Sequence, residues 1–127
     1  MKPTTEKGFR EKIRIACRGV GTYKEEFEPV VARLAECYVR MQTTRAEYKR
    51  GGSQILVEYT NKSGAVNLQK NPLLTELDFL QKTALEMERE LGLTPASLRK
   101  INEAAMLAAP AEEDALSAAL GALRLIG

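Results

Sequence analysis

The residues best placed to do chemistry are basic side chains at the start of the chain, where six Lys or Arg residues lie between Lys2 and Arg18 against two acidic ones. On a helix Lys7, Arg10 and Arg14 share a face, because they are three and then four residues apart. Arg18 continues this row by one turn. Such a row can neutralise phosphates and gain affinity from counterion release. The same pattern is typical of a solvated helix surface, so both interpretations stay open. The candidate DNA-binding residues are Lys7, Arg10, Lys12, Arg14 and Arg18.

Signals of catalysis are sparse. The 127 residues include no His, which is the commonest general base and metal ligand, and no GxxxxGK[ST] phosphate-binding loop. The two cysteines, Cys17 and Cys37, have no CxxC spacing and lie on apolar stripes, which favours buried, reduced thiols over a zinc site. We therefore expect no enzyme activity in this chain, no cofactor and no metal.

The composition predicts one mainly helical domain with a thin core. Hydrophobic residues make up 44% of the chain, but aromatic residues only 6%, and much of the rest is alanine, which buries little area. A thin core favours stability gained from neighbouring copies. The start of the chain has no apolar signal-peptide region, and no apolar run approaches the length that spans a membrane. We expect a cytosolic protein without a membrane partner.

The helical pattern begins with a short basic helix at 6–18, ended by Gly19 and Gly21, after which Thr22 and Glu25 predict a capping box. A longer amphipathic helix then reaches about Lys49, before a Gly-Gly stop. Its narrow apolar stripe suits helix-on-helix packing, within the chain or between copies. The predicted oligomer-interface residues on this stripe are Phe27, Val31, Leu34, Tyr38, Met41 and Tyr48.

Residues 54–69 change to a period of two and predict a β-hairpin, since Asn61 and Gly64 are typical of a type I turn closed by a G1 bulge. A lone hairpin is marginal in water, so it must pack on helices or pair with other copies. Two further helices follow, at 76–91 and 95–108. Thr75 with Asp78 is the predicted cap of the first, with Gly92 as its C′ residue; Thr94 and Pro95 open the second. Its expected inward residues are Leu98, Ile101, Ala105 and Ala108.

The last stretch, 112–126, is acidic in its first turn and then carries an apolar face. Acidic residues are favoured at a helix start by the helix dipole. The stretch packs on its own domain, docks on a partner protein or is disordered. The expected docking residues are Leu116, Leu120 and Leu123. The predicted organisation is a basic segment at 1–21, a helical core at 22–109 and an amphipathic tail at 110–127.

The residues from Asn71-Pro72 to the Gly92-Leu93-Thr94-Pro95 motif resemble the P27 family of phage terminase small subunits. The order of elements from about residue 25 to 102 matches as well. One departure is Leu98, where the family often has Arg, so no role is assigned to Arg99. The resemblance implies a helical subunit that assembles into a ring, recognises double-stranded viral DNA in the host bacterial cytoplasm and delivers it to the large terminase subunit, which carries the ATPase and nuclease. The tail would dock that large subunit.

Two other classes stay open. The helices at 76–91 and 95–108 could form a helix-turn-helix regulator, although the second helix offers only Arg99 and Lys100 as cations. Alternatively, the chain could be a structural phage assembly protein without DNA affinity.

Overall fold

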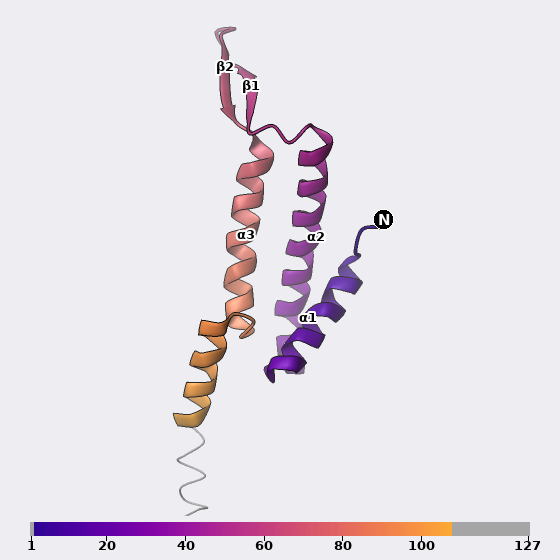
Figure 1. Ribbon diagram of the computed structural model, residues 1–127, viewed down its shortest axis with the longest axis vertical. Coiled ribbons are helices and arrows are strands. Elements are labelled where there is room, and N and C mark those ends of the chain that lie inside the picture. The colour runs from indigo at the N-terminus through magenta and orange to yellow at the C-terminus, as the bar shows by residue number, and fades with distance from the viewer. Residues whose placement is uncertain (1, 108–127) are drawn as a thin grey trace, which may run out of the picture.

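The computed structural model describes residues 2–107 as a three-helix body with a hairpin at one end (Figure 1). The elements are α1 (Glu6–Val20), the short 3-10 helix η1 (Glu25–Phe27), α2 (Glu28–Arg50), β1 (Leu56–Thr60), β2 (Val66–Lys70) and α3 (Pro72–Glu90). A further helical stretch at 95–107 continues beyond α3, away from the hairpin. The predicted class, mainly helical with a small hairpin, is confirmed.

Helix α1 is capped at both ends by residues next to it in the sequence. The Thr5 side chain accepts a hydrogen bond from the Gly8 N–H at 3.1 Å, and Gly21 ends the helix in the left-handed region at φ 78°. The helix lies against α2 and runs in the opposite direction (Figure 1). Accordingly Thr4, at its start, exchanges two hydrogen bonds with Gln42 in the second half of α2.

Helix α2 begins without the predicted capping box. The N-cap of η1 is Lys24 and that of α2 is Phe27, and neither uses a side-chain hydrogen bond. The prediction was wrong because the Thr22 hydroxyl has a distant partner: it donates to the Leu91 carbonyl at 2.6 Å. The end of α2 agrees with the expectation, since the helix stops at Arg50 before Gly51.

The hairpin forms as predicted. β1 pairs with β2 in antiparallel register, with Tyr59 opposite Asn67. In the turn, the Asn61 side chain accepts hydrogen bonds from the N–H groups of Ser63 and Ala65, and Gly64 has φ 85°. Asn61 and Gly64 therefore fix the hairpin through local chemistry.

The start of α3 differs from the prediction, because the helix begins at Pro72 and its cap is Asn71, whose side chain accepts from the Leu73 N–H. Asn71 can cap the helix directly before Pro72, because a proline at the first helical position has no N–H that would need a hydrogen-bond partner. Thr75 and Asp78 lie inside the helix instead. The predicted end is confirmed: Gly92 has φ 69°.

The core lies where α1, α2 and α3 meet. Among the described residues its apolar members are Ile13, Cys17, Val31, Leu34, Ala35, Cys37, Met41, Leu77, Leu80, Ala84 and Leu91. The 95–107 stretch adds little to it. Thr94 caps this stretch as predicted, accepting from the Ser97 N–H, but all residues from 101 to 107 are exposed. The expectation that Ile101 and Ala105 point inward was wrong, because this helix extends past the end of the three-helix body (Figure 1); Ala108 lies outside the described residues.

Candidate nucleic-acid interface

The cations of α1 are divided between two sides of the helix. Ile13 and Cys17 are buried and mark the side that faces the core. The helical period of 3.6 residues places Lys7, Arg14 and Arg18 together on one flank of the helix, about 100° round from these residues, with Arg10 nearer the core side. We call these four residues the α1 basic row. Lys12 is separate: its ammonium lies 5.8 Å from the centre of the Phe9 ring, beside a groove described below.

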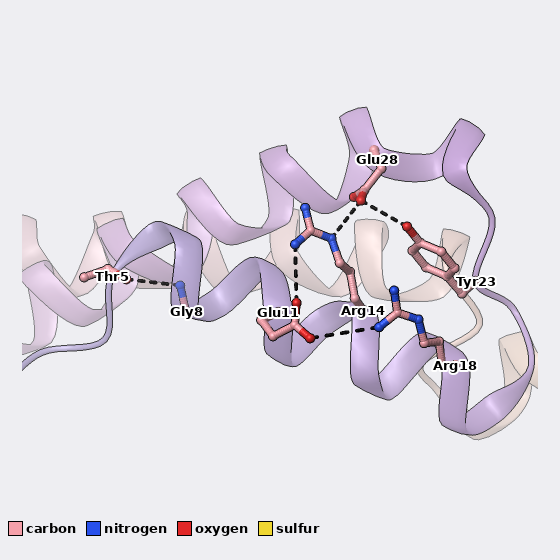
Figure 2. A network of polar contacts seen from close by, with 7 residues as sticks. All are labelled: Thr5, Gly8, Glu11, Arg14, Arg18, Tyr23 and Glu28. Carbon is pink, nitrogen blue, oxygen red and sulfur yellow. Dashed lines mark hydrogen bonds and ion pairs between the residues drawn. The ribbon is translucent and has the colours of Figure 1, made fainter.

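Arg14 is the most strongly held member of the basic row (Figure 2). Its Nε donates to a Glu28 carboxylate oxygen at 2.7 Å, and the Tyr23 hydroxyl donates to the same oxygen at 3.1 Å. A longer bond of 3.5 Å joins Arg14 to Glu11. These contacts connect α1, the loop that follows it and the first turn of α2, so Arg14 orients the helix that carries the row.

The network also sets the charge of Glu28. Partial burial would raise the pKa of its carboxyl group, but the hydrogen bonds from Arg14 and Tyr23 and the Arg14 charge outweigh that effect and lower the pKa. The same environment raises the pKa of Tyr23, through burial first and its bond to Glu28 second. Glu28 is therefore ionised at neutral pH, and part of the Arg14 charge is neutralised.

The other arginines of the row also have acidic neighbours. Arg18 lies 3.9 Å from Glu11, with its guanidinium 4.6 Å from the centre of the Tyr23 ring, and Arg10 pairs with Glu6. Lys7 is exposed and makes no ion pair within the described part of the chain. Lys7 and Arg18 are thus the members of the row that phosphate can reach with the least rearrangement.

Most residues of the predicted oligomer-interface stripe pack against the core of the single chain. Val31, Leu34 and Met41 are core residues. Phe27 and Tyr38 are partly buried against the same core. These contacts leave the exposed surface of α2, rather than its apolar stripe, to face other molecules.

Tyr38 and Tyr48, the two tyrosines predicted for the oligomer interface, are held by hydrogen bonds within the chain. The Tyr38 hydroxyl donates to Glu88 on α3 at 2.8 Å; burial, and then this bond, raise the pKa of Tyr38 above its ordinary value. The Tyr48 hydroxyl donates to the Ser53 carbonyl at 3.0 Å. Each tyrosine therefore contributes to the structure of the single chain.

A groove opens between α1 and α2, with a volume of about 590 Å³. Apolar side chains from both helices and Leu93 form much of its lining. Three cations also line it, Lys12, Arg45 and Lys49, and among the described lining residues there is no acidic one. We call this feature the α1–α2 groove. The sequence signal for Arg45 and Lys49 is their spacing of one helical turn, but only the packing of α1 on α2 shows that Lys12 lines the same groove.

The hairpin presents apolar side chains to solvent. Ile55 and Leu68 are each 66% exposed, Val66 is 61% exposed, and Leu56 and Tyr59 are also exposed. In the observed register, Leu56, Leu68 and Val66 share one face of the hairpin, and Ile55 and Tyr59 share the other. Clustered apolar surface of this kind marks an interaction site.

No group of three or more metal-ligating side chains occurs within residues 2–107. Cys17 and Cys37 are free thiols buried in the core, as predicted, and burial raises the pKa of each. No helix in this part of the chain is long and apolar enough to cross a membrane. The docking residues predicted in the tail, Leu116, Leu120 and Leu123, lie outside the described residues.

Fold and surface together describe a small helical protein that presents a basic row at α1 and exposed apolar side chains at a hairpin. Comparison with protein families identifies it further: the model for the phage terminase small subunit matches residues 7–106, which include all of the basic row and the hairpin. The chain belongs to the phage terminase small subunit family. No curated protein and no solved structure matches it.

Proposed function

We propose that this chain is the DNA-recognition subunit of a phage terminase, which binds viral DNA in the host cytoplasm and delivers it to a separate large subunit for packaging. Catalysis would belong to that large subunit. The observation that carries the proposal is the basic row along one flank of α1, within a chain of this family. The Asn71-Pro72 and Gly92-Leu93-Thr94-Pro95 motifs favour the P27 group within the family.

The residues of the α1 basic row differ in how freely their side chains can contact phosphate. Lys7 and Arg18 are exposed and available, whereas Arg14 is committed to Glu28 and keeps α1 in position. One copy therefore offers few phosphate contacts. Several copies on one duplex would add their contacts and raise the effective concentration of each row. DNA recognition by this protein would thus depend on assembly.

The assembly we propose is a ring of copies joined through the hairpin and the exposed surface of α2. The exposed hairpin supports this arrangement, because a two-stranded hairpin with apolar side chains on both faces is marginal alone in water. Burying about 50 Å² from each of five such side chains removes roughly 250 Å² of apolar surface, about 6 kcal/mol before the costs of association. Hairpin contacts of that size would add substantially to the stability of a small subunit.

The DNA-binding part of the proposal is tested by removing charge without disturbing the fold. In the variant Lys7→Gln with Arg18→Gln, two exposed cations are lost while the Arg14–Glu28 pair is retained. A matched control, Lys82→Gln with Lys100→Gln, removes the same charge from exposed sites on α3 and on the helical stretch at 95–107. Binding to a fluorescent duplex is measured by anisotropy across a range of salt concentrations.

We expect the row variant to bind more weakly than the wild type. Its plot of log K against log salt should have a slope less negative by about 2 for each copy on the DNA, since each phosphate contact contributes about 0.9 to the magnitude of the slope. The control variant should keep a slope close to that of the wild type. If the row variant binds as the control does, α1 is not the DNA-binding surface.

A further inference from the structure

The α1–α2 groove has the chemistry of a site for an acidic, apolar peptide. Phosphate would use its three cations but not its apolar lining, which includes Phe9, Ile13 and Met41. A peptide with carboxylates beside an apolar face would use both. Apolar surface bordered by charge of one sign selects partners of the opposite sign.

The chain itself contains a segment with this composition. Glu112 and Glu113 precede Leu116, Leu120 and Leu123. On a helix these leucines share a face, and the two glutamates flank that face one turn earlier. The sequence predicted this tail to be a docking segment, and residues 108–127 are outside the described structure.

The ends of the groove match the ends of this segment. Arg45 and Lys49 are one turn apart in the last part of α2, at the hairpin end of the body. Ala16 and Leu93 line the groove from the other direction, near the ends of α1 and α3. A helix bound with its acidic turn at Arg45 and Lys49 would place its leucines over the apolar lining.

The tail of the same chain cannot reach this position. The part of α2 from Glu28 to Arg45 spans about 25 Å. Helical residues 95–107 end beyond the opposite end of the body from Arg45 (Figure 1). Glu112 would therefore have to cross more than about 25 Å from the last described residue, whereas residues 108–112 reach at most about 18 Å. The segment that fits must come from another molecule.

We propose that the α1–α2 groove binds the C-terminal segment 111–127 of a neighbouring copy, with Glu112 and Glu113 paired to Arg45 and Lys49. This inference rests on the proposed assembly of several copies, but not on DNA binding. It assigns the tail to a contact between subunits, in place of the large-subunit contact that the sequence alone predicted.

A cross-linking experiment on the full-length protein tests the proposal. One copy carries Ala46→Cys, in the groove wall, and a second copy with a different affinity tag carries Ala119→Cys, beside the leucine face. The two are co-expressed so that mixed assemblies form, and are then oxidised. The native thiols are buried, and wild-type protein treated in the same way gives the background.

We expect a disulfide-linked dimer that carries both tags. Adding Arg45→Glu and Lys49→Glu to the groove copy should lower its yield by at least about tenfold, and adding Glu112→Lys and Glu113→Lys to the tail copy should restore it. The control pair Lys82→Glu and Lys100→Glu makes the same charge change away from both the groove and the hairpin and should leave the yield unchanged.

Three outcomes would overturn the inference. A cross-link that forms only when both new cysteines are in one chain would show that the tail binds its own groove. A multi-subunit protein without a two-tag dimer would overturn this inference alone and leave the large subunit as the partner of the tail. A protein whose light-scattering mass is that of a monomer would overturn both this inference and the proposed assembly.

Discussion

The hydrogen bond between Thr22 and Leu91 offers a sharp test of how the fold positions α1. Thr22 comes shortly after the last residue of α1, and Leu91 follows the last residue of α3. This hydrogen bond of 2.6 Å therefore connects the C-terminal ends of the two helices. Thr22 is 9% exposed and Leu91 is 2% exposed. Water is therefore poorly placed to replace the hydroxyl if it is removed.

The variant Thr22→Val keeps the shape of the side chain but leaves the Leu91 carbonyl without this donor. A buried group that loses its hydrogen-bond partner costs about 1–3 kcal/mol, and burial at both ends favours a value of about 2 kcal/mol. For a domain of this size, that corresponds to a drop in melting temperature of roughly 8 °C. The free energy of unfolding is measured by urea titration, followed by circular dichroism at one fixed protein concentration.

Thr22→Ser is the matched control, because it keeps the hydroxyl and removes one methyl group. Its cost should be about 1 kcal/mol, from the lost methyl contact alone. Equal stability of Thr22→Val and the wild type, within about 0.5 kcal/mol, would refute the reasoning, as would a Ser variant less stable than the Val variant.

Two further predictions concern ionisable groups. Because the folded pKa of Glu28 lies below its ordinary value of 4.5, its contribution to stability is fully present above that pH and is lost as the pH falls through the lower folded value. Glu28→Gln should therefore flatten the pH dependence of the free energy of unfolding below about pH 5, and an unchanged acid profile would contradict the assignment. Cys17 and Cys37 are buried with raised pKa values, so in the native protein both should react with a disulfide reagent at least about tenfold more slowly than in urea. Rapid labelling of either thiol without denaturant would show that the core opens readily.

The parts of the fold that depend on neighbouring residues were predictable from the sequence. Asn61 and Gly64 specify the hairpin turn through hydrogen bonds within five residues, and Gly21 and Gly92 end their helices through a local backbone preference. The Thr22 capping box was a reasonable local prediction, but a partner 69 residues away binds the hydroxyl. Local patterns do not encode which distant carbonyl a side chain will meet.

The candidate site was only partly predictable for the same reason. Helical spacing correctly grouped Lys7, Arg14 and Arg18 on one side of α1. It could not show that Glu28, in the next helix, holds Arg14, since that contact depends on how α1 packs on α2. The α1–α2 groove is likewise a product of packing, and Lys12 joins Arg45 and Lys49 there only in the folded chain.

If several copies of this chain act together on one DNA duplex, the assembly and its DNA complex are visible in the mass of the protein in solution. That mass is measured by light scattering behind a sizing column, for the purified full-length protein alone and with a double-stranded DNA fragment. We expect a discrete multi-subunit species whose mass rises by that of one duplex at low salt and returns to its original value at high salt, as counterions displace the phosphate contacts. A monomer that elutes separately from the DNA at low salt would show that the copies do not act together.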